Sequence, residues 1–317
     1  MKRYIMLFWA IILFSCGKDG QLEKEISKIH IETSVDRFDL AFANATEGDI
    51  PYLKEKYPYL FPSQFPDSVW VAQLKDTFQI ELNKEVTDAF PDFEREQEFS
   101  DLFRHIKYYF PEKKIPKIVT VTSYVDYNNN VVYTDSLLFV SLDTYLGKGH
   151  RFYAGIQEYF RNNFESEMMV SDAAGAFART LIPRESKRSF LSKLIYYGKE
   201  LYLKDLLIPF KSDAQKIGFT QEQYLWAEAN ESEIWRYFIE NELLFSTDSK
   251  LDNRFINPAP FSKFYLELDA ESPGRIGQYI GWQIIRAYME NNDVSLLQLL
   301  KSSSEEIFNK SRFKPRK

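Results

Sequence analysis

The only cysteine of the 317-residue chain, Cys16, carries a thiol that could act as a nucleophile or accept a lipid. Before it, Lys2 and Arg3 form a basic tip, and residues 4–14 contain no charged side chain. A stable membrane-spanning helix needs ~20 apolar residues, so this run is too short to be one. A basic tip, a short apolar run and a small residue, here Ser15, are typical of a secretory signal that is removed from the mature protein.

The residues next to the thiol predict lipid attachment at Cys16. The sequence LFSC at 13–16 resembles a bacterial lipobox, in which the thiol is alkylated with diacylglycerol, the peptide is cut before the cysteine and the new amine is acylated. The alternative is an ordinary signal with an incidental cysteine, since Phe14 is less usual at its position than a small residue. We expect a signal peptide over 1–15, a lipidated cysteine and tether over 16–28, and membrane contact through the lipid, because two or more acyl chains hold firmly.

The three histidines offer little metal chemistry. His30, His105 and His150 are too far apart in the sequence for two imidazoles to stand one helical turn apart. His150 lies near Asp143 and Glu158 in the sequence, so a histidine–carboxylate metal site is a candidate there, although a histidine at a helix entry is more often a surface or capping residue. We therefore expect no metal and no cofactor.

Carboxylates gather around two tryptophans in the second half of the chain. Glu228, Glu231 and Glu233 stand close to Trp226 and Trp235. Paired carboxylates could hydrolyse glycosides, but a solvated helix face is the more common role of such a cluster, with the tryptophans in the core. The chain also has no complete phosphate-binding loop and no G-x-S-x-G nucleophile elbow. We predict no catalytic residues.

The charge balance argues against nucleic acid as a partner. Removal of residues 1–15 would leave 38 basic and 46 acidic residues, a net charge of −8, whereas nucleic-acid binding requires a basic face. Hydrophobic residues make up 44% and charged residues 27%, as in ordinary globular proteins. With no second cysteine, the folded part contains no disulfide.

The apolar pattern predicts a mostly helical α+β domain over residues 29–317. Residues 28–39 suggest a first strand, and 116–143, with period-two β-branched residues, suggest a small antiparallel or mixed sheet. The expected helices, several ended by proline or glycine, cover 49–61, 67–90, 93–111, 150–163, 171–182, 187–207, 220–244 with a break, 274–290 and 295–310.

The helix expected near 274–290 has two apolar sides and two glycines in its interior. Ser272 is a candidate N-cap, and Gly277 and Gly281 stand four residues apart beside Tyr279. Each glycine costs about 1 kcal/mol of helix propensity relative to alanine, so a packing reason is expected. We predict close approach of another helix backbone to Gly277 and Gly281. The alternative is that these two glycines and Tyr279 line a groove for a ligand.

Seven stretches, taken in order along the chain, resemble the gliding motility lipoprotein GldB family. These stretches are KYPYLFP, PDSVW, HIKYYFP, VTSYVDY, VSLDTYLG, YGKELYLKDLLIP and PGRIGQYIGWQII. They span about residues 30–290. The resemblance implies a lipid-anchored envelope protein required for bacterial gliding, with other gliding or type IX secretion proteins as partners and with no established enzymatic role.

The stretch PGRIGQYIGWQII and the region rich in Trp and Glu before it also resemble, more distantly, predicted zinc-dependent peptidases that carry H-E-x-x-H on a helix. The comparable stretch here, VSDAAGAFARTLI at 170–182, has neither the histidines nor the glutamate. The resemblance therefore implies a degenerate zincin-like fold without zinc or peptidase activity. An envelope hydrolase, or a lipoprotein that binds peptide or glycan in an aromatic groove, remains the alternative. Gly17 is not an acidic retention signal, so we favour the periplasmic face of the outer membrane over the inner membrane.

Overall fold

The computed structural model describes residues 16–267 and 269–316, and it confirms the mostly helical α+β class. The strands are β1 (Val35–Arg37), β2 (Lys117–Val121), β3 (Val131–Tyr133) and β4 (Leu137–Ser141). The α-helices are α1 (Cys16–Ile26), α2 (Phe38–Ala43), α3 (Ile50–Lys56), α4 (Asp67–Lys75), α5 (Thr77–Ala89), α6 (Glu96–Tyr109), α7 (Glu158–Arg161), α8 (Met169–Leu181), α9 (Phe190–Leu207), α10 (Asp213–Ile217), α11 (Gln221–Ala229), α12 (Glu231–Glu240), α13 (Ile276–Asn291), α14 (Leu296–Lys301) and α15 (Ser304–Ser311). Short 3-10 helices are η1 (Glu47–Asp49), η2 (Pro58–Leu60), η3 (Leu142–Thr144), η4 (Arg151–Tyr153), η5 (Ser166–Met168) and η7 (Asp269–Glu271), and η6 (Asp252–Ile256) is a π-helix.

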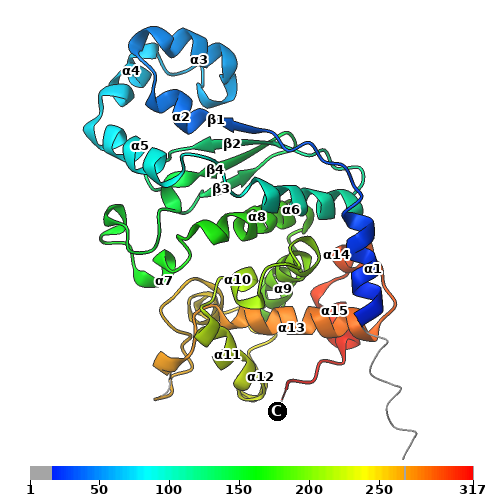
Figure 1. The fold of residues 1–317 in the computed structure, drawn as a ribbon. Helices are drawn as coiled ribbons and strands as arrows, with labels where there is room; N and C mark the ends of the chain where they lie inside the picture. The colour runs from blue at the N-terminus through cyan, green and yellow to red at the C-terminus, as the bar shows by residue number, and fades with distance from the viewer. Residues whose placement is uncertain (1–15, 268, 317) are drawn as a thin grey trace, which may run out of the picture.

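The elements form layers on the two sides of one small sheet (Figure 1). Helices α2–α5 lie on one side of the sheet, α6 and α8 lie on the other, and α9 and α13 follow beyond α8. A small, mostly aromatic core holds α2, α3 and α4 together, a second core fills the space between the sheet, α6 and α8, and a third lies around α9 and α13. Among the described helices, none is long and apolar enough to cross a membrane.

The sheet is mixed, in the order β1-β2-β4-β3. Strand β2 pairs in parallel with both β1 and β4, and only β3 and β4 are antiparallel. The purely antiparallel reading of 116–143 is therefore wrong and the mixed one is right. The reason is that β4 pairs with β3 on one side and with β2 on the other, so it lies between them. Strand β1, residues 35–37, pairs with β2 and forms the edge of the sheet opposite β3. Of the segment 28–39, only these three residues are a strand.

One face of the sheet supplies the central core. The register places Ile118 opposite Leu138, and Val131 opposite Val140, so these four side chains point to one face. All four are buried with α6 and α8 in the same core. The burial of one alternating set of β-branched and leucine side chains explains why the period-two pattern predicted these strands.

Helices α9 and α13 pack backbone to backbone. A Cβ atom on Gly281 would overlap the carbonyl group of Leu194, and one on Gly198 would overlap the carbonyl group of Gly281. At Gly277 an added Cβ would lie 2.9 Å from the carbonyl oxygen of Phe255. Only glycine permits this separation between the two helices, which brings their polar side chains within reach of each other.

Several helix boundaries differ from those predicted. Only η4 and α7 form within 150–163, because Gly155 adopts a φ of +89° and turns the chain between them. The stretch 67–90 divides at Asp76, whose side chain accepts a hydrogen bond from the backbone N–H of Gln79 and caps α5. The stretch 295–310 divides in the same way at Ser303, which caps α15.

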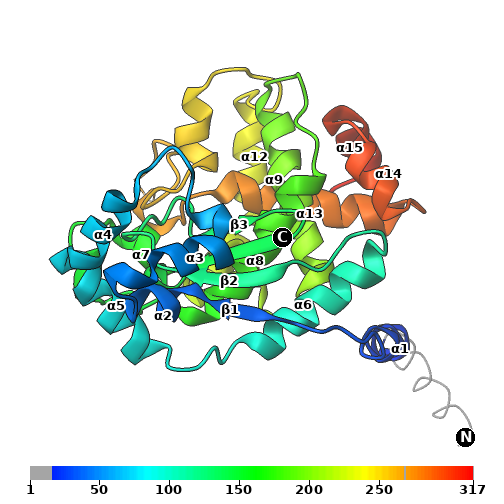
Figure 2. The ribbon, with the colours of Figure 1, turned by 90° about the horizontal axis from the view of Figure 1, so that it is seen from above.

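The first described helix is one that the sequence pattern did not suggest. Helix α1 covers most of the expected tether and lies at one end of the molecule next to α6 (Figure 2). Its last residue, Ile26, is buried, and Nε2 of His105 on α6 lies 3.3 Å from the Glu23 carboxylate. The C-terminal turns of α1 are thus attached to the folded domain.

Candidate functional site

The expected lipid site stands at the beginning of the described chain. Cys16 is the first residue of α1, whereas the lipobox residues 13–15 and the expected signal peptide 1–15 lie outside the described residues.

The histidines are dispersed, and two of them have a local structural role. His105 is buried, and its Nδ1 donates to the carbonyl of Asp101. His150 caps η4, since its Nδ1 accepts from the backbone N–H of Phe152, and its Nε2 lies 3.4 Å from Glu85. His30 is exposed. Within 16–267 and 269–316, no three His, Cys, Asp or Glu residues come together as a metal site would require.

Asp143, the expected neighbour of His150, instead holds a loop in place. It is fully buried, and its carboxylate accepts hydrogen bonds from the backbone N–H groups of Ser123 and Val125. Tyr124 and Val125 both have positive φ, which is unfavourable for a β-branched residue. Burial raises the pKa of Asp143 despite these hydrogen bonds. The carboxylate thus fixes a strained loop and is not paired with the histidine.

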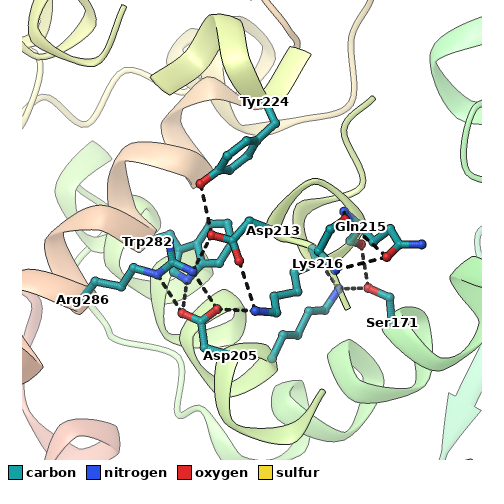
Figure 3. A network of polar contacts seen from close by, with 10 residues as sticks. Ser171, Asp205, Asp213, Gln215, Lys216, Tyr224, Trp282 and Arg286 are labelled. Carbon is teal, nitrogen blue, oxygen red and sulfur yellow. Dashed lines mark hydrogen bonds and ion pairs between the residues drawn. The ribbon is translucent and has the colours of Figure 1, made fainter. Parts of the chain in front are cut away.

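A network of polar contacts links α9, α10, α11 and α13 (Figure 3). At its centre Asp205 on α9 accepts two hydrogen bonds from Arg286, at 2.8 and 2.7 Å, and one from Trp282 Nε1 at 2.8 Å. The Arg286 guanidinium also stacks over the Trp282 ring, 3.8 Å from its centre. Burial alone would lower the pKa of Arg286, but the two aspartates Asp205 and Asp213 raise it overall, so this cation is firmly charged.

Helix α10 brings the second carboxylate and the second cation. Asp213 accepts from Arg286 at 2.9 Å and from the hydroxyl of Tyr224 at 3.1 Å. Lys216 donates to both carboxylates, Asp205 at 3.0 Å and Asp213 at 3.1 Å. Burial raises the pKa of Asp213, yet Arg286 and Lys216 lower it more, and the net pKa falls below its ordinary value. Two anions and two cations therefore neutralise each other.

A buried lysine connects this network to α8. Lys204 donates to the carbonyl of Lys216 at 2.9 Å and to the hydroxyl of Ser171 at 3.2 Å. Burial lowers the pKa of Lys204. Next to Ser171, the carboxylate of Asp172 accepts from Tyr145 and Asn130, both at 2.8 Å, and burial raises its pKa.

The comparisons with known proteins identify the family. The chain matches the model of the gliding motility protein GldB over residues 19–315. The chain belongs to the GldB family. No curated protein and no solved structure matches it. A cell-envelope location fits a GldB protein. The expected likeness to zinc-dependent peptidases is not shown by these comparisons.

In this GldB protein the predicted carboxylate cluster has a structural position. Glu231 is buried, and its carboxylate accepts from the hydroxyl of Tyr279 at 2.8 Å and from the backbone N–H of Arg316 at 3.0 Å. The expectation of a fully solvated helix face is wrong for this residue, because α12 packs its first turn against α13. Glu233 is exposed, as expected. Tyr279 thus points away from α9 and toward α12.

The N-terminus of α13 also differs from the prediction. The hydroxyl of Ser272 lies within hydrogen-bond distance of the carbonyls of Ser262 and Asp269, to which it donates, and Ser272 does not cap α13. The N-cap is Arg275, with a φ of +61°, and its guanidinium donates to the carbonyl of Gly218 at 2.6 Å. Sequence reasoning missed both this residue and the whole charge network, because the partners are far apart in the chain and stand on helices whose charged positions look solvated. Lys204 and Asp205, inside a strongly apolar helix, were the available signal.

Proposed function

We propose that this GldB protein is a lipid-anchored, non-enzymatic component of the cell envelope that supports gliding and the type IX secretion apparatus. The observation that carries the proposal is the mutual neutralisation of Asp205, Asp213, Arg286 and Lys216 across α9, α10 and α13. A side chain that acts as a catalytic acid or base must be free to exchange a proton with the substrate. In this network each charge is already committed to a partner that holds the helices together.

The anchoring and the partners follow from the same proposal. Cys16 would carry the lipid, and the folded domain would present its surface to other gliding or secretion proteins from the periplasmic face of the outer membrane. Family membership supports the gliding role, and the lipobox supports the anchor.

The test uses conservative replacements of the groups most suited to chemistry. Asp172→Asn and Glu200→Gln keep the shape of the side chain and remove its proton chemistry; Glu200 is a buried carboxylate of α9 that pairs with Arg179 at 2.8 Å. His150→Asn is smaller than the parent side chain and removes the imidazole. If the protein acts by binding, cells that carry each variant should glide whenever the protein is as abundant as the parent. Loss of gliding by one variant at normal abundance, with unchanged capture of partner proteins from solubilised envelopes, would instead favour a hydrolase.

One cavity favours a second candidate, a lipoprotein that binds peptide or glycan. Between α11, α12 and the residues Phe264, Leu266 and Asp269 lies a cavity of about 410 Å³. Trp226, Tyr237 and Phe264 supply aromatic walls, and Asn230 and Glu233 supply polar groups. Aromatic faces with amide and carboxylate groups are suited to sugar rings and peptide side chains. Saturable binding of oligosaccharides that is lost in Trp226→Ala, with an unchanged melting temperature, would establish this alternative.

A further inference from the structure

A second cavity, separate from the charge network, has a basic lining in an acidic protein. It has a volume of about 460 Å³ and lies between residues 182–188, the first half of α9 and η6. Five basic and two acidic side chains line it, which gives a net charge of +3, whereas the whole chain has a net charge of −6. The basic lining residues are Arg184, Lys187, Arg188, Lys193 and Lys199.

Three of these five cations already have partners. Lys193 pairs with Asp252 at 2.6 Å, and Lys187 pairs with Glu305 at 2.7 Å. Lys199 is only 3% exposed and donates to the backbone carbonyls of Leu300 and Ser302, at 3.2 and 2.8 Å. An ammonium group has three N–H donors, so Lys199 retains one, in a wall of the cavity.

The other two cations have no internal partner. Among the residues that the structure describes, the side chains of Arg184 and Arg188 make no ion pair and no hydrogen bond. The acidic neighbour Glu185 makes no ion pair with either of them, and its carboxylate accepts from both the backbone N–H and the hydroxyl of Ser304 at 2.7 and 2.8 Å. Two guanidinium groups, each with a fork of donors, therefore border a cavity with a net charge of +3, and neither of its two acidic side chains pairs with them.

The helix terminus contributes nothing to this site. The first N–H groups of α9 are satisfied, since Phe190 and Leu191 donate to the carbonyls of Ser246 and Leu244, and Ser192 donates to Ser189. Recognition must come from the side chains. The remaining walls include Ile182, Tyr196 and Ile256, so the cavity also offers an apolar side to a ligand.

We propose that this cavity binds a phosphate-bearing anion through Arg184 and Arg188, with Lys199 as the buried cation behind them. Arginine matches phosphate oxygens with two parallel hydrogen bonds, and low-dielectric walls strengthen the field of clustered charges. Burial lowers the pKa of Lys199, and a bound anion would oppose that effect. The phosphate could belong to a free polyanion or to the headgroup of a lipid whose chains lie on the apolar wall.

The experiment compares two variants of equal net charge. The full chain, purified in neutral detergent, is titrated with sodium pyrophosphate at constant ionic strength in a calorimeter. The test variant is Arg184→Gln with Arg188→Gln, and the matched control is Lys28→Gln with Lys114→Gln, two exposed lysines whose side chains have no partner among the described residues. Each charge-assisted hydrogen bond contributes to the binding free energy, so the arginine variant should bind pyrophosphate at least about tenfold more weakly than the parent. The control should bind it like the parent.

A second arm identifies the source of the phosphate. The same proteins are titrated with dihexanoyl phosphatidylglycerol and with the zwitterionic dihexanoyl phosphatidylcholine. Binding of the anionic lipid that is lost in the arginine variant identifies a headgroup site, and binding of pyrophosphate alone identifies a site for a free polyanion. The proposal fails if neither anion binds saturably, or if the arginine variant, with the melting temperature of the parent, binds as tightly as the control.

Discussion

The carbonyl group of Leu194 occupies the space in which any other residue at position 281 would place its Cβ atom, so Gly281 and Leu194 define the distance between α13 and α9. Both helices carry the charge network on their adjoining parts, with Asp205 on α9 and Arg286 on α13. The glycine contact and the ion pair are therefore two consequences of one helix separation.

Replacement of this glycine should destabilise the protein although alanine is the better helix former. Propensity alone favours Gly281→Ala by about 1 kcal/mol, but the added methyl group must displace the Leu194 backbone, and overpacking typically costs ~1–3 kcal/mol. Gly20 in α1 is the matched control, because an added Cβ meets nothing within 4 Å. Thermal unfolding should show a lower melting temperature for Gly281→Ala than for the parent. Gly20→Ala should not lower the melting temperature. An equal or higher melting temperature for Gly281→Ala would contradict the close packing.

Arg286→Met should be among the more destabilising single changes in the α9–α13 region. Methionine replaces the apolar stem of the arginine but not its charge. Asp205 and Asp213, whose side chains are 16% and 29% exposed, then have Lys216 as the one remaining cation of the network. Removal of one partner of a fully buried ion pair costs about 3–5 kcal/mol, and we expect a smaller loss here because these side chains are partly exposed. Arg236→Met breaks an exposed pair with Glu233, and such pairs contribute about 1 kcal/mol or less. Urea unfolding of both variants measures the difference, and similar losses in the two would show that the network contributes no more than a surface pair.

Apolar periodicity predicted the helices that build the core. Helix α8 was expected at 171–182 and covers 169–181, and α13 was expected at 274–290 and covers 276–291. Long helices with buried faces repeat every 3.6 residues, so the signal is strong. Short elements with strained turns escaped this reasoning. The positive φ at Gly155 divides one expected helix, and local serine or aspartate caps divide two others.

The polar site was less accessible from the sequence. Asp205 and Arg286 are 81 positions apart, and no local pattern indicates that two such residues meet. Gly277 and Gly281 were singled out because interior helix glycines need a reason, and the structure provides the neighbouring backbone for it. The partner helix, and hence Gly198 as the reciprocal contact, could be recognised only once the packing was known.

The pH dependence of stability should separate two partly buried carboxylates, Asp213 and Asp172. The pKa of Asp213 in the fold lies below its ordinary value of 3.8, so this group stabilises the protein above about pH 4, and that contribution is lost as the pH falls through the folded pKa. The pKa of Asp172 is raised by burial, so its contribution is present below pH 3.8 and is lost as the pH rises through the folded pKa.

The corresponding variants should respond in opposite directions. Relative to Asp213→Asn, the parent should become more stable as the pH increases from 3 to 6. Relative to Asp172→Asn, the parent should become less stable as the pH increases over the same range. Unfolding free energies from urea titrations at several pH values measure both differences. Parallel pH profiles for the two variants would show that burial and ion pairing do not act on these groups as described.

The purified protein should contain no stoichiometric zinc. Structural and catalytic zinc sites need at least three protein ligands in tetrahedral geometry, and the His, Cys, Asp and Glu side chains of the described chain do not gather in this way. Metal analysis after dialysis should find well below one zinc per chain, and a chelator should leave the melting temperature unchanged. One zinc per chain that survives dialysis would contradict this expectation and favour the peptidase alternative.

Cys16→Ala should release the protein from the membrane without unfolding it. The substitution removes the only thiol in the chain, and among the described helices none could replace the lipid as a membrane anchor. The variant should therefore leave the detergent-extracted lipoprotein fraction and appear among the proteins that need no detergent. Ser27→Ala is a suitable control, because it alters an exposed position at the end of α1 and keeps the thiol. If Cys16→Ala partitions like this control, the lipobox is incidental and attachment must have another cause. If it is soluble and folded but cells no longer glide, the protein must act at the membrane surface.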